Sequence, residues 1–125
     1  MKKAYAYYCG LSIGKTIETQ QKMVRKYAKS NNIQIIEEFE EVVIPLNITK
    51  REELTKMLEK ISSNKDIDYI LVHSFEYITK DVMHMGYVMT ALELDNGKTR
   101  IHSITEENDY DDPTKLMLLM IKIHG

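Results

Sequence analysis

Short runs of aromatic and β-branched residues alternate along this chain with segments of helical periodicity, and that alternation constrains the fold more than any other feature. The runs predict four strands, at residues 4–9, 33–39, 67–72 and 99–104. Each run is followed by a segment in which apolar residues recur every three or four positions. The order β-α-β-α-β-α-β-α is typical of an α/β domain, so we expect a mostly parallel sheet of four or five strands with helices on both faces.

The first two predicted helices have recognisable starts. Thr16 is the expected N-cap of a helix that runs from residue 17 to about residue 29. The second helix is expected to open with a capping box, in which Thr49 and Glu52 each bind a free amide of the first turn. Apolar side chains then follow at helical spacing: Leu54, Met57, Leu58 and Ile61. Residues 40–48 contain a proline and show no clear period, so we expect a loop there.

The last two predicted helices differ in how much of their surface is apolar. The third has one apolar stripe, formed by Val82, Met85, Met89 and Leu92. The fourth, at about residues 113–124, begins with Asp112 as N-cap and Pro113 at its first position. It is apolar nearly all round, which does not suit the surface of a monomer. We expect this helix to be cut short or to form a homodimer through Leu116, Leu119, Met120 and Ile123.

The composition indicates one domain and excludes several classes of protein. With 43% hydrophobic and 29% charged residues, a chain of 125 residues can bury a core, and we interpret residues 1–125 as one domain. No apolar run approaches the ~20 residues of a membrane helix. The single cysteine, Cys9, excludes an internal disulfide and fits a reducing cytoplasm. The net charge of -2 predicts no tight DNA binding by this domain alone.

Residues 10–16, Gly-Leu-Ser-Ile-Gly-Lys-Thr, follow the first predicted strand and resemble a phosphate-binding P-loop. A P-loop has four residues between its first glycine and Gly-Lys-Thr, whereas this segment has three and places Cys9 where the glycine belongs. The third predicted strand also ends in Val72 and His73, without the aspartate that binds Mg²⁺ in such NTPases. A nucleotide-binding P-loop is therefore a remote alternative.

A different pattern extends over nearly the whole chain. Tyr8-Cys-Gly-Leu-Ser12 precedes Ile17-Glu-Thr-Gln20, and Arg51-x-x-Leu54-x-x-Met57-Leu58 lies in the next helix. Residues 71–81 read Leu-Val-His-Ser-Phe-Glu-Tyr-Ile-Thr-Lys-Asp, and residues 112–117 read Asp-Pro-Thr-Lys-Leu-Met. In this order the segments resemble the catalytic domain of the resolvase/invertase family, the serine site-specific recombinases.

The resemblance implies DNA strand cleavage and exchange through a covalent phosphoserine link. Ser12 would then be the nucleophile, Arg51 would clamp the phosphate, and Gln20 would lie near the serine loop. Glu76 and Lys80 stand where the family has an aspartate and an arginine, and they complete the candidate site. No cofactor is implied. The partner would be DNA, bound with the help of a DNA-binding domain that this chain lacks.

The sequence departs from the family pattern at the arginines. Gly10 stands two residues before Ser12, Tyr77 follows Glu76, and Lys80 occupies the third position, all in place of arginine. Lysine offers a point charge and tyrosine none, whereas arginine binds phosphate with two parallel hydrogen bonds. We therefore expect a degenerate site. The alternative is a non-catalytic, resolvase-like module that acts through dimer contacts.

The candidate residues also have simpler interpretations. Ser12 could cap local backbone, Arg51 could be a solvated charge, and Glu76 could form an exposed pair with Lys80. The acidic residues at 37–41 and 106–112 are expected to be solvated faces that repel DNA. No metal site is expected, because no ligand spacing relates these residues: Cys9, His73, His84, His102 and His124.

Overall fold

A computed structural model describes residues 1–10, 15–42, 51–64, 66–78, 86, 88, 90, 92 and 98–105. The elements in these ranges alternate along the chain as the sequence predicts. In order they are β1 (Lys2–Gly10), α1 (Lys15–Ser30), β2 (Ile33–Val42), α2 (Glu52–Ser63), β3 (Tyr69–Val72), the 3-10 turn η2 (Phe75–Tyr77) and β4 (Arg100–Ser103).

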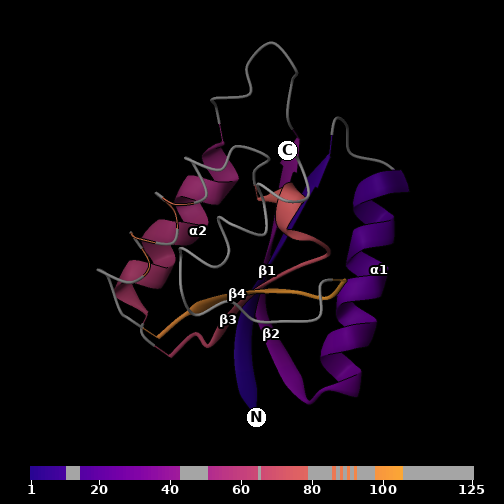
Figure 1. Ribbon diagram of the computed structural model, residues 1–125, viewed down its shortest axis with the longest axis horizontal. Coiled ribbons are helices and arrows are strands. Elements are labelled where there is room, and N and C mark those ends of the chain that lie inside the picture. Colours follow the sequence, from indigo (N-terminus) through magenta and orange to yellow (C-terminus); the bar gives the residue numbers. More distant parts are fainter. Residues whose placement is uncertain are drawn as a thin grey trace.

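The strands form one parallel sheet in the order β2-β1-β3-β4. Parallel neighbours need crossover connections, and α1 lies in the crossover from β1 to β2 while α2 lies in the one from β2 to β3. Figure 1 shows α1 and α2 on opposite sides of the sheet. The expected parallel α/β fold with helices on both faces is therefore confirmed.

Alternating side chains of β1 reach the two layers of the core. The small residues Ala4 and Ala6 face α1, which leaves room for that helix to lie close to the sheet. The large residues Tyr5 and Tyr7 face the other way, into the layer under α2. The α1 layer also contains Tyr8, Ile17, Val24, Ala28 and Leu71. The α2 layer also contains Phe39, Leu54, Met57, Ile61, Ile67, Ile70, Val72, Phe75, Ile78, Val88, Leu92 and Ile101.

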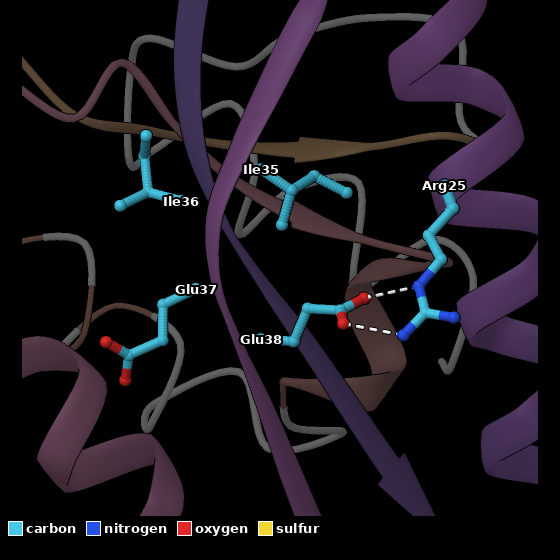
Figure 2. A pocket seen from close by; sticks show the side chains of 5 residues that line it. All are labelled: Arg25, Ile35, Ile36, Glu37 and Glu38. Carbon is cyan, nitrogen blue, oxygen red and sulfur yellow. Dashed lines mark hydrogen bonds and ion pairs between the residues drawn. The ribbon is translucent and has the colours of Figure 1, made fainter.

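A bulge in β2 changes which of its residues face each helix. Ala4 pairs with Ile35 but Tyr5 pairs with Glu37, so Ile36 is the extra residue. Figure 2 shows Ile36 and Glu37 on one side of the strand, and Ile35 on the other. A shallow hollow of about 330 Å³ lies at the bulge. Such a bulge increases local twist, which protects an edge strand from pairing with other chains.

Several predicted boundaries of helices and strands are wrong. Helix α1 begins at Lys15, so Thr16 lies inside the helix and is not its N-cap. Strand β2 continues to Val42 through part of the predicted loop, because Glu41 turns inward. Helix α2 begins at Glu52, which rules out the capping box that placed Glu52 in the third position of the helix. Three members of its predicted apolar stripe, Leu54, Met57 and Ile61, are buried, and the fourth, Leu58, is partly buried against the core.

The C-terminal predictions are tested only in part. Residues 86, 88, 90 and 92 are helical, and Leu92 of the predicted third stripe is buried. Val82, Met85 and Met89 lie outside the described residues, as do the acidic stretch 106–112 and the last predicted helix. Within the described ranges, no helix has the length and apolar character needed to cross a membrane.

Candidate active site

The carboxyl ends of the strands bring several predicted site residues to one edge of the sheet. β1 ends at Gly10 and its neighbour β3 ends at Val72, while the next strand along the chain, β2, lies on the far side of β1. Ligands of open α/β sheets bind where the strand order reverses in this way, beyond the carboxyl ends. The candidate site is therefore the edge of the sheet at Gly10 and Val72, together with the turn at residues 73–78.

Gln20 anchors the end of β1. Its side chain accepts a hydrogen bond from the backbone N–H of Cys9 at 3.1 Å and donates one to the Cys9 carbonyl at 2.8 Å. Gln20 is only 2% exposed, and its amide pairs with both polar backbone groups of the partly buried Cys9. The strand that leads toward Ser12 is thereby attached to α1.

Arg51 lies against the same end of the sheet and is held by two other elements. Its Nε and Nη2 donate hydrogen bonds to the Tyr7 hydroxyl at 3.1 and 2.7 Å, and Nη2 also donates to the Tyr77 carbonyl at 3.0 Å. The side chain is 13% exposed, and its Nε is 3.9 Å from a carboxylate oxygen of Glu41. Arg51 is therefore not the solvated charge of the simpler interpretation.

Glu41 joins the end of β2 to the start of α2. Its two carboxylate oxygens accept the backbone N–H groups of Glu53 at 3.2 Å and Leu54 at 3.0 Å, and the Tyr7 hydroxyl donates to it at 3.2 Å. A carboxylate at a helix N-terminus satisfies free amides and matches the helix dipole. Glu41 is 5% exposed, so the prediction that residues 37–41 form a solvated face is wrong at this position.

The surroundings of Arg51 change the ionisation of two side chains. Burial raises the pKa of the Tyr7 hydroxyl above its ordinary value, although the Arg51 guanidinium opposes this effect. Burial also raises the pKa of the Cys9 thiol. Both groups are therefore neutral near pH 7, and Cys9 behaves as a small, partly buried apolar residue that packs against the core.

The hydrogen bonds of Arg51 to described residues use two of its three nitrogens. A guanidinium carries five N–H donors, and the bonds to Tyr7 and Tyr77 use those on Nε and Nη2. Nη1 makes no hydrogen bond to any described residue. Arg51 can thus keep its internal contacts and still offer one nitrogen to an anion at this edge.

The turn after β3 carries two aromatic side chains, Phe75 and Tyr77, and Tyr77 stands where the resembled family has an arginine. Tyr77 packs edge-on against the ring of His73, with centroids 5.7 Å apart, and Phe75 is buried. The His73 carbonyl accepts hydrogen bonds from Ser103 and Thr105, which ties the ends of β3 and β4 together. His73 Nδ1 is buried and has no hydrogen-bond partner within the described part of the chain.

The structure locates three of the five predicted site residues. Gln20 and Arg51 both contact the carboxyl end of β1, as the predicted site requires. Glu76 is exposed and makes no hydrogen bond or ion pair with any described residue. Ser12 and Lys80 lie outside the described residues, so their predicted roles, and the predicted pair of Lys80 with Glu76, stay predictions.

Glu41 and Tyr7 were not predicted as members of the site. A signal for Glu41 was present, because it follows the apolar Phe39 by two residues and strand residues two apart share a face. The sequence around Tyr7 did not indicate a role in the site, since a tyrosine in an aromatic-rich strand is equally typical of the hydrophobic core. In the described part of the chain, no group of three or more His, Cys, Asp or Glu residues is placed to hold a metal ion.

Comparisons with known proteins show a family and a shared fold. The model of the Resolvase N-terminal domain family matches residues 9–124. The chain is similar to the N-terminal catalytic domain of TP901-1 integrase, with a TM-score of 0.75 and 19% identity over 98% of this chain and 94% of that one. It is also similar to a resolvase family site-specific recombinase from Streptococcus pneumoniae, with a TM-score of 0.77 and 17% identity over 99% and 86% of the two chains.

A further similar structure is the C-terminal catalytic domain of ISC1926 TnpA, an IS607-like serine recombinase. Its TM-score is 0.69, with 21% identity over 97% of this chain and 80% of that one. At such low identities the structural matches show a shared fold. No curated protein matches the chain significantly by sequence.

Proposed function

The chain belongs to the Resolvase N-terminal domain family, and on that basis we propose that it serves as the catalytic-type domain of a serine site-specific DNA recombinase. The observation that carries the proposal is the match of one family model to residues 9–124, a range that contains Ser12, Arg51, Glu76 and Lys80. The alternative P-loop hypothesis has no comparable support, because the family model that covers residues 10–16 is that of the Resolvase N-terminal domain.

The proposed reaction is a transesterification. The Ser12 hydroxyl oxygen attacks a DNA phosphorus, a new O–P bond forms, and the bond from phosphorus to the leaving sugar oxygen breaks. The serine proton is lost and the leaving oxygen gains one, so the step needs no oxidant or reductant. Rejoining to a different strand reverses these changes.

Arg51 is the described residue that fits a phosphate-binding role. Its Nη1 is the donor that the internal contacts leave available, and a fixed donor near developing negative charge lowers the barrier to such reactions. Gln20 acts as a positioning residue, since it holds Cys9 three residues before Ser12. Glu76 and Lys80 complete the proposed site.

A trapping experiment tests the proposal. We expect nicked DNA duplexes with a randomised central sequence to form a covalent adduct with the protein, detected on denaturing gels and sequenced after capture. Ser12→Ala should abolish the adduct, whereas Ser63→Ala, a change at an exposed helix end, should leave it unchanged. Absence of any wild-type adduct, or an adduct that survives Ser12→Ala, would overturn the proposal.

One observation favours a second candidate, a non-catalytic resolvase-like module. The Tyr77 carbonyl binds Arg51 and the Tyr77 ring packs on His73, so the turn that carries a family arginine is used here for internal contacts. This module would act through contacts between two copies. Loss of the adduct in the experiment above, together with a stable dimer, would support it.

We also propose the remaining features of the assembly. Two copies pair through Leu116, Leu119, Met120 and Ile123, the partner is DNA, and a separate domain selects the DNA site. A reducing cytoplasm suits the single cysteine. Light scattering at tens of micromolar protein should show a dimer that Leu119→Glu dissociates, and a strictly monomeric wild type would contradict the pairing.

A further inference from the structure

Helix α1 carries a stripe of unpaired lysines on its outer face. We use the name α1 lysine stripe for Lys22, Lys26 and Lys29, all of them exposed. Their spacing of four and three residues keeps them within about 60° of arc around the helix axis. None of the three makes a hydrogen bond or ion pair with a described residue.

The carboxylates nearest to this face are already engaged elsewhere. Figure 2 shows Glu38 of β2 in a two-pronged contact with Arg25, with N–O distances of 2.7 and 2.8 Å. Glu37 points to the other side of the strand, where Lys60 of α2 binds it at 2.8 Å. Two of the β2 carboxylates are therefore neutralised by cations. Glu40 keeps its charge, because its described partner is the uncharged side chain of Gln21 on α1.

The stripe has a defined beginning and end. Glu18 lies one turn before Lys22 and is the one described carboxylate of α1 on this arc. Lys29 lies in the last turn of the helix, beside the exposed Met1. From Lys22 to Lys29 the helix rises about 10 Å. The start of α1 follows the carboxyl end of β1 in the chain, and Lys22 lies about 10 Å along the helix axis from that start.

We propose that the α1 lysine stripe binds the phosphate backbone of duplex DNA next to the segment held at the candidate active site. This inference rests on the proposed function for its partner, and it adds a contact surface remote from the site residues. A DNA strand presents one phosphate per 3.4 Å of helix axis, so three lysines over about 10 Å match about three consecutive phosphates. Lysines are flexible point charges, which suits backbone contacts that do not depend on sequence.

The same face fits a protein partner poorly. Stable protein interfaces have an apolar centre and bury roughly 1,200 Å² or more in total. Along the outer face of α1 the exposed large apolar residue is Met23, which is 43% exposed, and the neighbouring side chains are charged or polar. A positively charged face without an apolar centre therefore favours a polyanion such as DNA over a protein as the partner.

Salt dependence of DNA binding tests the inference. We would measure binding of a fluorescent 25-base-pair duplex by anisotropy between 20 and 200 mM NaCl for the wild type and for the triple variant Lys22→Gln, Lys26→Gln, Lys29→Gln. Each phosphate contact contributes about 0.9 to the magnitude of the slope of log K against log salt concentration. The slope of the triple variant should therefore be smaller in magnitude than that of the wild type by about 2.7. Equivalently, the contacts of the stripe should account for an affinity loss of about 40-fold between 50 and 200 mM NaCl.

Two matched variants distinguish the effect of the α1 lysine stripe on DNA binding from the effect of the protein's total charge. The triple variant Lys56→Gln, Lys60→Gln, Lys98→Gln removes the same charge from lysines that are ion-paired to Glu53, Glu37 and Asp68 and should leave the slope nearly unchanged. Glu18→Gln should tighten binding, because it removes a negative charge from the arc of the stripe. All variants should stay folded at the assay temperature, because every substituted side chain is exposed and exposed ion pairs contribute little to stability.

The outcomes distinguish this inference from the proposed function. Salt-dependent binding through the stripe without a Ser12 adduct would support the surface and contradict the catalytic proposal. A Ser12 adduct with an unchanged slope in the stripe variant would support catalysis and overturn the surface. Absence of DNA binding at 20 mM NaCl, or equal binding of a poly-glutamate peptide at matched charge, would also overturn it.

Discussion

The side chain of Gln20 binds both backbone polar groups of Cys9, with a 3.1 Å hydrogen bond from the amide N–H and a 2.8 Å hydrogen bond to the carbonyl. One side-chain amide from α1 thus binds the backbone of β1 one residue before the strand ends at Gly10. The chain continues from there toward Ser12. A glutamine matches this geometry because it combines one acceptor and one donor in a single plane.

Gln20→Ala should lower the free energy of unfolding by about 1–3 kcal/mol, because it removes two hydrogen bonds to the partly buried backbone of Cys9. Gln21→Ala changes a neighbouring glutamine that lies outside the core and should cost less than about 0.5 kcal/mol. Urea unfolding followed by circular dichroism measures both values. Equal effects of the two substitutions would show that the Cys9 contacts contribute nothing specific.

Glu41→Gln should destabilise the protein by about 2 kcal/mol. The amide keeps the shape of the carboxylate but loses the charge that faces Arg51 and the N-terminus of α2. Glu52→Gln removes an exposed charge from the same helical turn, so it reports the dipole effect alone and should cost less than about 1 kcal/mol. A larger effect at Glu52 than at Glu41 in urea unfolding would contradict the buried role of Glu41.

The fold was predictable from the sequence because its elements depend on local patterns. The aromatic run at residues 4–9 forms the predicted strand β1, and three of the four residues in the predicted α2 stripe, Leu54, Met57 and Ile61, are buried. Element ends were less predictable. Thr16 is a good N-cap by type, yet the helix begins one residue earlier.

The internal contacts of the site were less predictable because they depend on distant parts of the chain. Arg51 binds Tyr7 and Tyr77, which are 44 and 26 residues away. Glu41 is buried only because α2 places its first amides against the end of β2. Four glutamates in five residues predict a solvated face when the sequence is considered locally. Glu40 is exposed, as this predicts, whereas Glu41 is buried.

The contact between Arg25 and Glu38 should make part of the stability depend on pH. Hydrogen bonds from Arg25 hold the pKa of Glu38 below its ordinary value. The contact therefore contributes stability above the unfolded pKa of about 4.3, and that contribution is lost as the pH falls through the lower folded value. Because Arg25 is exposed, the contribution should stay under about 1 kcal/mol.

Thermal unfolding at a series of pH values checks this expectation for Glu38. Between about pH 5 and pH 3 the melting temperature of the wild type should fall more steeply than that of Glu38→Gln, which has no carboxylate to protonate. Glu59→Gln alters an exposed glutamate of α2 and should follow the wild-type curve. Parallel curves for the wild type and Glu38→Gln would show that the contact does not stabilise the fold.

Tyr77→Arg should increase the rate of covalent adduct formation with nicked DNA. The Tyr77 carbonyl would still bind Arg51, since that contact uses the backbone, while the new guanidinium would replace a ring that carries no charge. One well-placed donor at a developing oxyanion is worth up to about 10²–10³ in rate, so we expect a gain of at least 10-fold.

Three control variants decide whether such a gain reflects phosphate binding. Tyr77→Phe should not change the rate, and Tyr77→Lys should give a smaller gain than arginine, because lysine lacks the two-pronged geometry. Tyr77→Arg combined with Ser12→Ala should give no adduct at all. If arginine and phenylalanine at position 77 behave alike, the turn after β3 does not reach the reacting phosphate, and the aromatic contact with His73 is its main role.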